Sequence, residues 1–147
     1  GFVKGDTHWE RPTDERTYEQ VEAADLIPFR ELVAAGLDGV MAAHLIFPAI
    51  DAQLAGFSPF WLQNVLRNKL HFRGVIFTDD LGMVAAHAVG DLTARAEAAI
   101  QGGADIVLPC NDRPGLIDLL DHWKPAPESG LARKWERMRK RAPGRRL

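Results

Sequence analysis

The segment GVIFTDD, residues 74–80, decides the expected fold class, because an apolar β-branched run ends there in two carboxylates. Two similar runs, residues 39–43 and 105–108, are followed by polar residues that include His44 and Asn111. Near-continuous apolar runs of this length are typical of strands buried on both faces. Helical patterns separate the three runs, so the sequence predicts an α/β fold with parallel strands and right-handed crossovers.

The carboxyl ends of these strands are the expected location of any active site. In α/β folds the residues that follow parallel strands gather at one edge, where ligands bind. His44, Asp79, Asp80 and Asn111 are predicted to meet at this edge. Three strand–helix units are too few for a closed barrel of eight, so the pattern leaves two hypotheses open, a small open sheet or part of a barrel.

Helices are predicted between and after the strands from caps, breaks and helical spacing. Residues 1–24 are instead expected to form a polar loop, because glycine, proline and many charges oppose regular structure. Residues 45–57 are expected to form a second loop. The expected helices are residues 25–36 with an Asp25 cap, a segment opening at Ser58-Pro59, a segment from Asp91 to Gly102-Gly103, residues 114–123, and a basic helix after Pro125 and Pro127.

Composition limits the class of protein. The chain has 147 residues, of which 46% are apolar and 26% charged, enough for one globular domain with a core. Its net charge of -2 argues against a nucleic-acid or membrane-surface role. The single cysteine, Cys110, cannot form an internal disulfide and favours a reducing, cytoplasmic location. The first residue is Gly1, so we expect a cut end, and the lack of a signal peptide says little.

Asp79 is the first candidate for chemistry. A carboxylate at the end of a buried strand would be partly desolvated and rigidly held. These properties suit a nucleophile toward a sugar anomeric carbon, because a carboxylate can both attack and leave. The alternative interpretation is that one aspartate of the Asp79-Asp80 pair caps the next element and the other is solvated.

The triplet Asp6-Thr7-His8 is the second candidate. A histidine two residues from an aspartate can donate one ring N–H to that carboxylate, which raises the basicity of its other nitrogen. A polar surface loop is the simpler interpretation of the triplet alone.

The remaining polar features are weaker candidates. His44 ends a strand and can line a pocket, whereas His71, His87 and His122 are expected to be structural or solvated. No spacing of histidine, cysteine and glutamate predicts a zinc site. A basic tail is expected to form a solvated terminal helix in preference to binding an acidic partner. Its residues are Arg133, Lys134, Arg137, Arg139, Lys140, Arg141, Arg145 and Arg146.

Several segments in order resemble family 3 of the glycoside hydrolases, in its β-N-acetylhexosaminidase branch. Residues 74–83 are similar to the nucleophile segment of that family. Residues 40–49 are similar to the strand before it, residues 58–67 to the intervening helix, and residues 98–111 to the final strand of a (β/α)₈ barrel. The resemblance covers nearly the whole chain and weakens after Lys124.

The resemblance implies retaining hydrolysis of terminal β-linked N-acetylglucosamine, from muropeptides of peptidoglycan recycling in the cytoplasm. It assigns Asp79 as nucleophile, His8 as acid/base on a mobile loop, and Asp6 as the residue that orients His8. His44 and Met83 are the expected substrate-binding residues. No metal and no organic cofactor is implied, and the expected partner is a carbohydrate, with no nucleic acid or membrane.

The resemblance also implies that part of the barrel is missing. A Lys-His pair of the family falls before Gly1, and about five strands are absent. We therefore expect the chain to be the C-terminal part of a (β/α)₈ barrel, about strands six to eight. Its parts are a catalytic loop (1–24), βα units (25–124) and a basic tail helix (125–147). The isolated chain should have little activity, and its exposed barrel edges favour self-association.

Two other functions stay open at this stage. One is a family 3 glycosidase of another specificity, such as a β-glucosidase, although such enzymes lack the Asp-x-His loop. The other is a non-catalytic half-barrel that binds sugar or acts as a scaffold.

Overall fold

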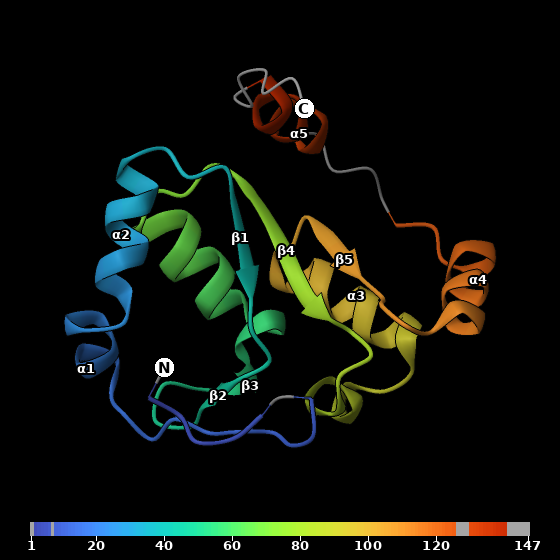
Figure 1. Cartoon of the computed structure of the whole chain (residues 1–147), viewed down its shortest axis with the longest axis horizontal. Coiled ribbons are helices and arrows are strands. Elements are labelled where there is room, and N and C mark those ends of the chain that lie inside the picture. Colours follow the sequence, from blue (N-terminus) through green and yellow to red (C-terminus); the bar gives the residue numbers. More distant parts are fainter. Residues whose placement is uncertain (1, 7, 126–129, 141–147) are drawn as a thin grey trace, which may run out of the picture.

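The structure, a computed structural model, describes residues 2–6, 8–125 and 130–140. Its centre is a three-stranded parallel sheet in the order β1 (Gly39–Ala42), β4 (Val75–Asp80), β5 (Ile106–Leu108). Gly39 pairs with Val75, and Phe77 pairs with Ile106. The three predicted parallel strands are therefore confirmed, and β4 continues through both aspartates (Figure 1).

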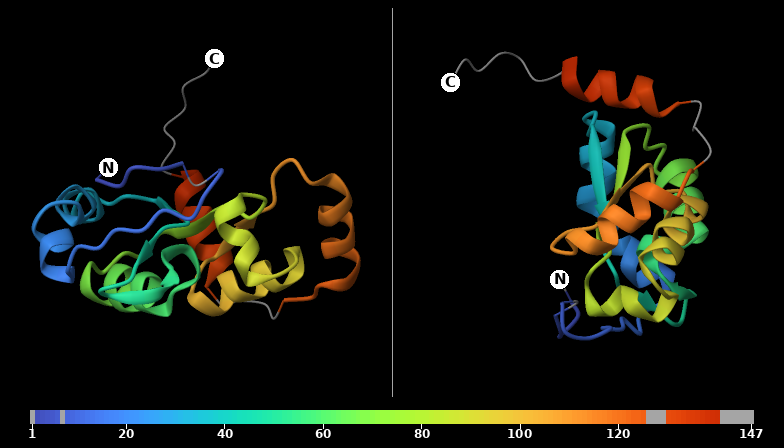
Figure 2. Two further views of the ribbon diagram at one scale, coloured as in Figure 1. Left: turned by 90° about the horizontal axis from the view of Figure 1, so that it is seen from below. Right: turned by 90° about the vertical axis from the view of Figure 1, so that its right-hand side faces the viewer.

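Helices η2 (Phe60–Lys69) and α3 (Leu92–Gly102) lie behind the sheet in Figure 1 and to one side of it in the right panel of Figure 2. Helix η2 is wound as a π-helix, and its apolar face is buried as expected. Leu62 and Leu66 of η2 pack with Ile76 of β4 and with the alanines of α3 in one core. On β1, Met41 is 56% exposed, so one face of the sheet is only partly covered.

The predicted helix starts are confirmed where the capping side chain is local. Ser58 Oγ accepts the Trp61 N–H, and the Asp91 carboxylate accepts the Ala94 N–H. Gly103 ends α3 in the left-handed conformation with φ 117°, which favours glycine. The last helix of the sheet region, α4 (Arg113–His122), begins one residue before its predicted start. The turn η3 (Val84–Val89) occupies the segment between β4 and α3.

The two loop predictions are wrong in part. Residues 1–24 contain helix α1 (Tyr18–Ala23), in which the Thr17 N–H is accepted by the Gln20 side chain. Residues 45–57 contain the hairpin β2 (Ile46–Phe47) and β3 (Asp51–Leu54), followed by the turn η1 (Ala55–Phe57). Tertiary packing explains both differences, because the ring of Phe47 lies 4.7 Å from that of Trp61, beside buried Val21.

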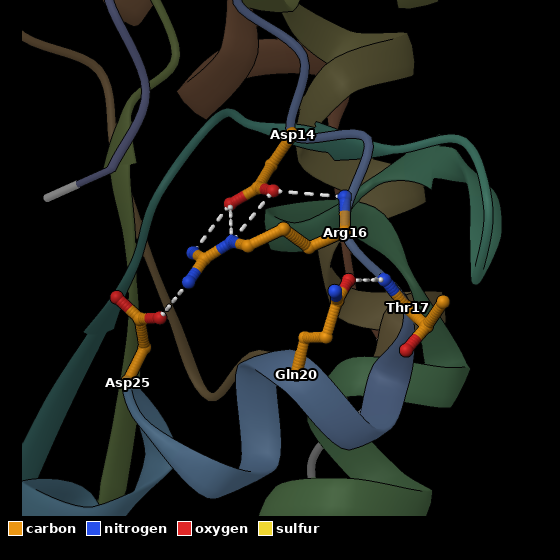
Figure 3. Close-up of polar contacts among 5 residues, drawn as sticks. All are labelled: Asp14, Arg16, Thr17, Gln20 and Asp25. Carbon is orange, nitrogen blue, oxygen red and sulfur yellow. Dashed lines mark hydrogen bonds and ion pairs between the residues drawn. The ribbon is translucent and has the colours of Figure 1, made fainter.

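Helix α2 (Leu26–Ala34) forms with Pro28 in its first turn, but Asp25 makes no capping bond to it. Its carboxylate instead accepts from Arg16, whose guanidinium also binds buried Asp14 with two nitrogens (Figure 3). These hydrogen bonds hold the pKa of Asp14 below its ordinary value. Asp14 also donates its backbone N–H to Ile46, so this network ties the end of the N-terminal loop to α2 and β2.

The prediction of a solvated basic helix is confirmed for most of α5 (Leu131–Lys140), which is largely exposed, but it is wrong for two of its basic side chains. Lys134 forms an ion pair with Asp105, and Arg137 donates to the carbonyl of Arg73. Helix α5 therefore covers the amino ends of the strands, opposite the N-terminal loop (Figure 2). Pro127, Arg141, Arg145 and Arg146 lie outside the described residues. No helix within the described ranges is long and apolar enough to cross a membrane.

Candidate active site

The site is built at a bulge near the carboxyl end of β4. Between the pairs Phe77–Ile106 and Asp80–Leu108, strand β4 contains one more residue than β5. The hydroxyl of buried Thr78 accepts the Leu108 N–H at 2.9 Å and so ties the two strands together at the irregularity. Bulges are common beside active sites because they change the direction of a side chain. The residue presented by this bulge is Asp79.

Asp80 is held by three backbone N–H groups and by the ring of His44, which come from three parts of the chain. Its Oδ1 accepts the Gly82 N–H at 2.8 Å and the Cys110 N–H at 2.9 Å. Its carbonyl accepts from His44 Nε2 and from the Met83 N–H. A carboxylate that accepts two amides in this way is fixed by the structure and is poorly suited to attack a substrate.

Asp79 differs from its neighbour in its hydrogen bonding. Its Oδ1 accepts the Asp80 N–H at 2.9 Å, and within the described part of the chain its Oδ2 has no hydrogen-bond or ion-pair partner. The side chain is half-buried. Asp79 is therefore held only by the amide of its neighbour, whereas Asp80 is fixed through two loops, so Asp79 is the less constrained of the two carboxylates.

Asp6 and His8 form the expected pair. His8 Nδ1 lies 2.7 Å from Asp6 Oδ1, and the His8 backbone N–H donates to the same oxygen at 2.9 Å. The backbone and ring hydrogen bonds from His8 lower the pKa of Asp6. The Asp6 and His8 side chains are 59% and 66% exposed, so the pair lies at the surface of the molecule. Thr7 lies outside the described residues.

The loop that carries this pair crosses the carboxyl-terminal side of the sheet, the side to which β1 and β4 point in Figure 1. Among the described residues no hydrogen bond or ion pair joins His8 to Asp79. The structure thus brings Asp6 and His8 together, and places their loop at the same side of the sheet as Asp79.

His44 and Met83 are both buried under the end of β4, with no more than 3% exposed surface. His44 stacks on Phe57 at 5.1 Å between ring centroids, and burial lowers the pKa of its imidazole. Both residues bind the carbonyl of Asp80, so the structure places them behind the site and does not place them at its surface.

Sequence reasoning missed the part played by Thr78 and Asp80. No local signal separates the two aspartates, because the amides that bind Asp80 belong to the turn after β4 and to the loop after β5. Cys110, whose thiol pKa is raised by burial and by the Asp80 carboxylate, also lies at this edge. Within residues 2–6, 8–125 and 130–140, no three histidine, cysteine or acidic residues are grouped to hold a metal ion.

Comparisons with known proteins place these features in context. Residues 1–140 match the family described as "Glycosyl hydrolase family 3 N terminal domain". The β-hexosaminidase of Idiomarina loihiensis is 50% identical over 138 residues, which make up 94% of this chain and 42% of that protein. The β-hexosaminidase of Tolumonas auensis is also 50% identical, over 88% of this chain and 39% of that protein.

A solved structure is similar over the same region. NagZ from Neisseria gonorrhoeae, in complex with N-trifluoroacetyl-D-glucosamine, has a TM-score of 0.84 and 40% sequence identity. The match covers 94% of this chain and 39% of that protein. The chain therefore spans about two-fifths of the length of these relatives.

Proposed function

The chain belongs to glycosyl hydrolase family 3, and from that premise we propose that it carries the nucleophile and the acid/base of a retaining β-N-acetylglucosaminidase. The observation that carries the proposal is the half-buried Asp79 carboxylate at the end of β4, whose one hydrogen bond among the described residues comes from the Asp80 N–H. The names of the relatives and the glucosamine derivative bound to the Neisseria gonorrhoeae protein support this specificity.

In the first step, an Asp79 oxygen attacks the anomeric carbon of a terminal β-linked N-acetylglucosamine. The bond to the leaving sugar breaks, and its oxygen takes a proton from His8 Nε2. Asp6 holds Nδ1 and supports the positive charge of the protonated ring.

In the second step, His8 removes a proton from water, and the water oxygen attacks the same carbon. The bond to Asp79 breaks, and the sugar leaves with its original configuration. A metal or organic cofactor is not required, because both reacting groups are side chains. His44 and Met83 support the end of β4 and do not contact the sugar in this scheme.

The chain is also proposed to form about strands six to eight of a (β/α)₈ barrel. Its parts are the catalytic loop (1–24), the βα units (25–124) and the tail (125–147). Support comes from the parallel order β1-β4-β5 with helices η2 and α3 behind it. The exposed Met41 on the sheet then faces the remaining barrel, or a second copy of the chain when that part is absent.

The natural substrates proposed are muropeptides with N-acetylglucosamine linked to anhydro-N-acetylmuramic acid, in cytoplasmic peptidoglycan recycling. This part of the proposal rests on the family resemblance. Digestion of such muropeptides, followed by mass spectrometry of released N-acetylglucosamine, is its test. Release of glucose from β-glucosides at a higher kcat/KM would instead favour the other family 3 specificity.

The activity itself is tested with 4-nitrophenyl N-acetyl-β-D-glucosaminide. The purified 147-residue chain is compared with a chimera that adds the preceding residues of the Idiomarina loihiensis relative. We expect hydrolysis by the chimera and little by the chain alone. Hydrolysis by the 147-residue chain alone would contradict the proposal that its site is incomplete. A chimera that folds but is inactive would favour the non-catalytic half-barrel.

A further inference from the structure

Beyond the nucleophile, the geometry around β4 identifies a residue that acts through it. We infer that Asp80 is a positioning residue, whose hydrogen bonds to Gly82, Cys110, His44 and Met83 fix the bulge that presents Asp79. This inference rests on the proposed function, because it gives Asp80 a part in the same reaction.

The carboxylate of Asp80 joins two loops. Through Oδ1 it binds the Gly82 N–H in the turn after β4 and the Cys110 N–H after β5, at 2.8 and 2.9 Å. The turn packs closely on this oxygen, since a Cβ at Gly82 would lie 3.1 Å from Asp80 Oδ1 and 3.3 Å from the Cys110 carbonyl. One acceptor atom therefore sets the distance between the ends of two neighbouring strands.

The carbonyl of Asp80 joins the same point to β1. Because a carbonyl only accepts, His44 Nε2 carries the proton in the 3.1 Å bond to it. His44 Nδ1 is buried without a partner among the described residues, and a Cβ on Gly56 would lie 3.2 Å from it. The neutral ring therefore fits this place, and a second ring proton would have no acceptor there.

These bonds act on Asp79 through one peptide group. The Asp80 N–H donates to Asp79 Oδ1 at 2.9 Å, so the orientation of the Asp79 carboxylate follows the orientation of residue 80. The function of Asp80 requires an acceptor at Oδ1 and does not require a negative charge. Asp79, in contrast, requires a charged oxygen for attack.

This difference defines the experiment, which compares D80N, D80A and D79N in the chimeric enzyme. D80N keeps Oδ1 as an acceptor, so we expect kcat to stay within about fivefold of the parent value. The small loss is expected because neutral hydrogen bonds are weaker than charge-assisted ones. D80A should lower kcat about 100-fold with little change in KM, the effect of a misplaced reacting group. D79N should abolish hydrolysis although it is equally isosteric. D91A, which removes only the cap of α3, is the matched control and should keep kcat.

A second readout does not depend on activity. Amide hydrogen exchange of Gly82 and Cys110 in the 147-residue chain should be slow in the parent and in D80N and fast in D80A. If D80A does not fold, the variants H44L and H44Q replace it in the experiment. A Gln side chain can donate a hydrogen bond to the Asp80 carbonyl as His44 does, whereas a Leu side chain cannot. Of the two variants, only H44Q should therefore keep kcat.

Three results would overturn the inference. They are unchanged exchange in D80A, unchanged kcat in D80A, and a loss in D80N as complete as that in D79N, which would make the Asp80 charge part of the chemistry. If the parent chimera is folded but inactive, the proposed function fails, and the exchange rates alone decide whether Asp80 fixes the bulge.

Discussion

Two aspartates at opposite ends of the same sheet have opposite environments. Asp105, at the amino end of β5, is buried and accepts from the Ile76 N–H, from Arg67 at 2.6 Å and from Lys134. Asp79, at the carboxyl end of β4, accepts one backbone N–H and keeps an oxygen without a partner among the described residues. One carboxylate is saturated with donors, and the other is available for a substrate.

One residue type thus contributes to stability at one end of the sheet and, under the proposed function, to chemistry at the other end. In (β/α)₈ barrels the carboxyl-terminal face carries the active site, and the opposite face contributes to stability. Lys134 of helix α5 pairs with Asp105 at the amino ends of the strands, while the N-terminal loop crosses the carboxyl-terminal side of the sheet (Figure 1). Substitutions at one end of the sheet should therefore change either activity or stability and leave the other property nearly constant.

The largest effect is expected at the carboxyl end, from His8→Ala. Loss of the proton donor should lower kcat/KM about 10³-fold for a disaccharide substrate, within the usual range for acid/base catalysis. The loss should be smaller for a 4-nitrophenyl substrate, whose leaving group needs less protonation. Steady-state kinetics of the chimera checks this, with His71→Ala at the exposed residue His71 as control. Equal losses on both substrates would argue against His8 as the acid.

A smaller effect, on stability, is expected at the amino end. Asp105→Ala leaves Arg67 without its buried partner and should lower the free energy of unfolding by about 3 kcal/mol, as for other broken buried pairs. Urea unfolding measures this change, and kcat per folded molecule should stay constant. As control, Glu22→Ala removes the exposed pair with Lys69 and should cost less than about 1 kcal/mol. Similar losses in both variants would contradict the difference between the two ends.

The smallest effect is the dependence of stability on acid. Burial raises the pKa of Asp105, but hydrogen bonds from Lys134 and Ile76 and the charge of Arg67 together hold it below the ordinary value. A lowered pKa means that Asp105 stabilises the fold above about pH 4 and loses this contribution as pH falls through its folded pKa. Between pH 6 and pH 3, the free energy of unfolding should therefore decrease less in Asp105→Asn than in the parent. An equal decrease in the free energy of unfolding would show that another carboxylate causes the acid sensitivity, for example Asp14, whose pKa is also lowered.

Local signals in the sequence predicted much of the fold. The three strands are continuous apolar runs, and the caps at Ser58 and Asp91 bind amides three residues away, so neighbouring residues determine both features. The pair of Asp6 and His8 was predicted for the same reason, because His8 lies only two positions after Asp6.

Features that depend on distant contacts were not predictable in this way. Asp25 has the sequence of a cap, but Arg16 competes for its carboxylate. The basic helix α5 has the sequence of a solvated tail, yet its Lys134 pairs with Asp105, 29 positions earlier. Asp79 and Asp80 are the same residue type in the same strand, and only the amides of Gly82 and Cys110 distinguish them.

Covalent trapping of the glycosyl-enzyme intermediate is the decisive test of Asp79 as the proposed nucleophile. The chimera is incubated with a slow, fluorinated N-acetylglucosaminyl fluoride, digested, and mapped by mass spectrometry. We expect one glycosyl adduct on the peptide that contains β4, with fragment ions that place it on Asp79. An adduct on Asp80, or full hydrolysis with no adduct on this peptide, would rule out Asp79 as the nucleophile.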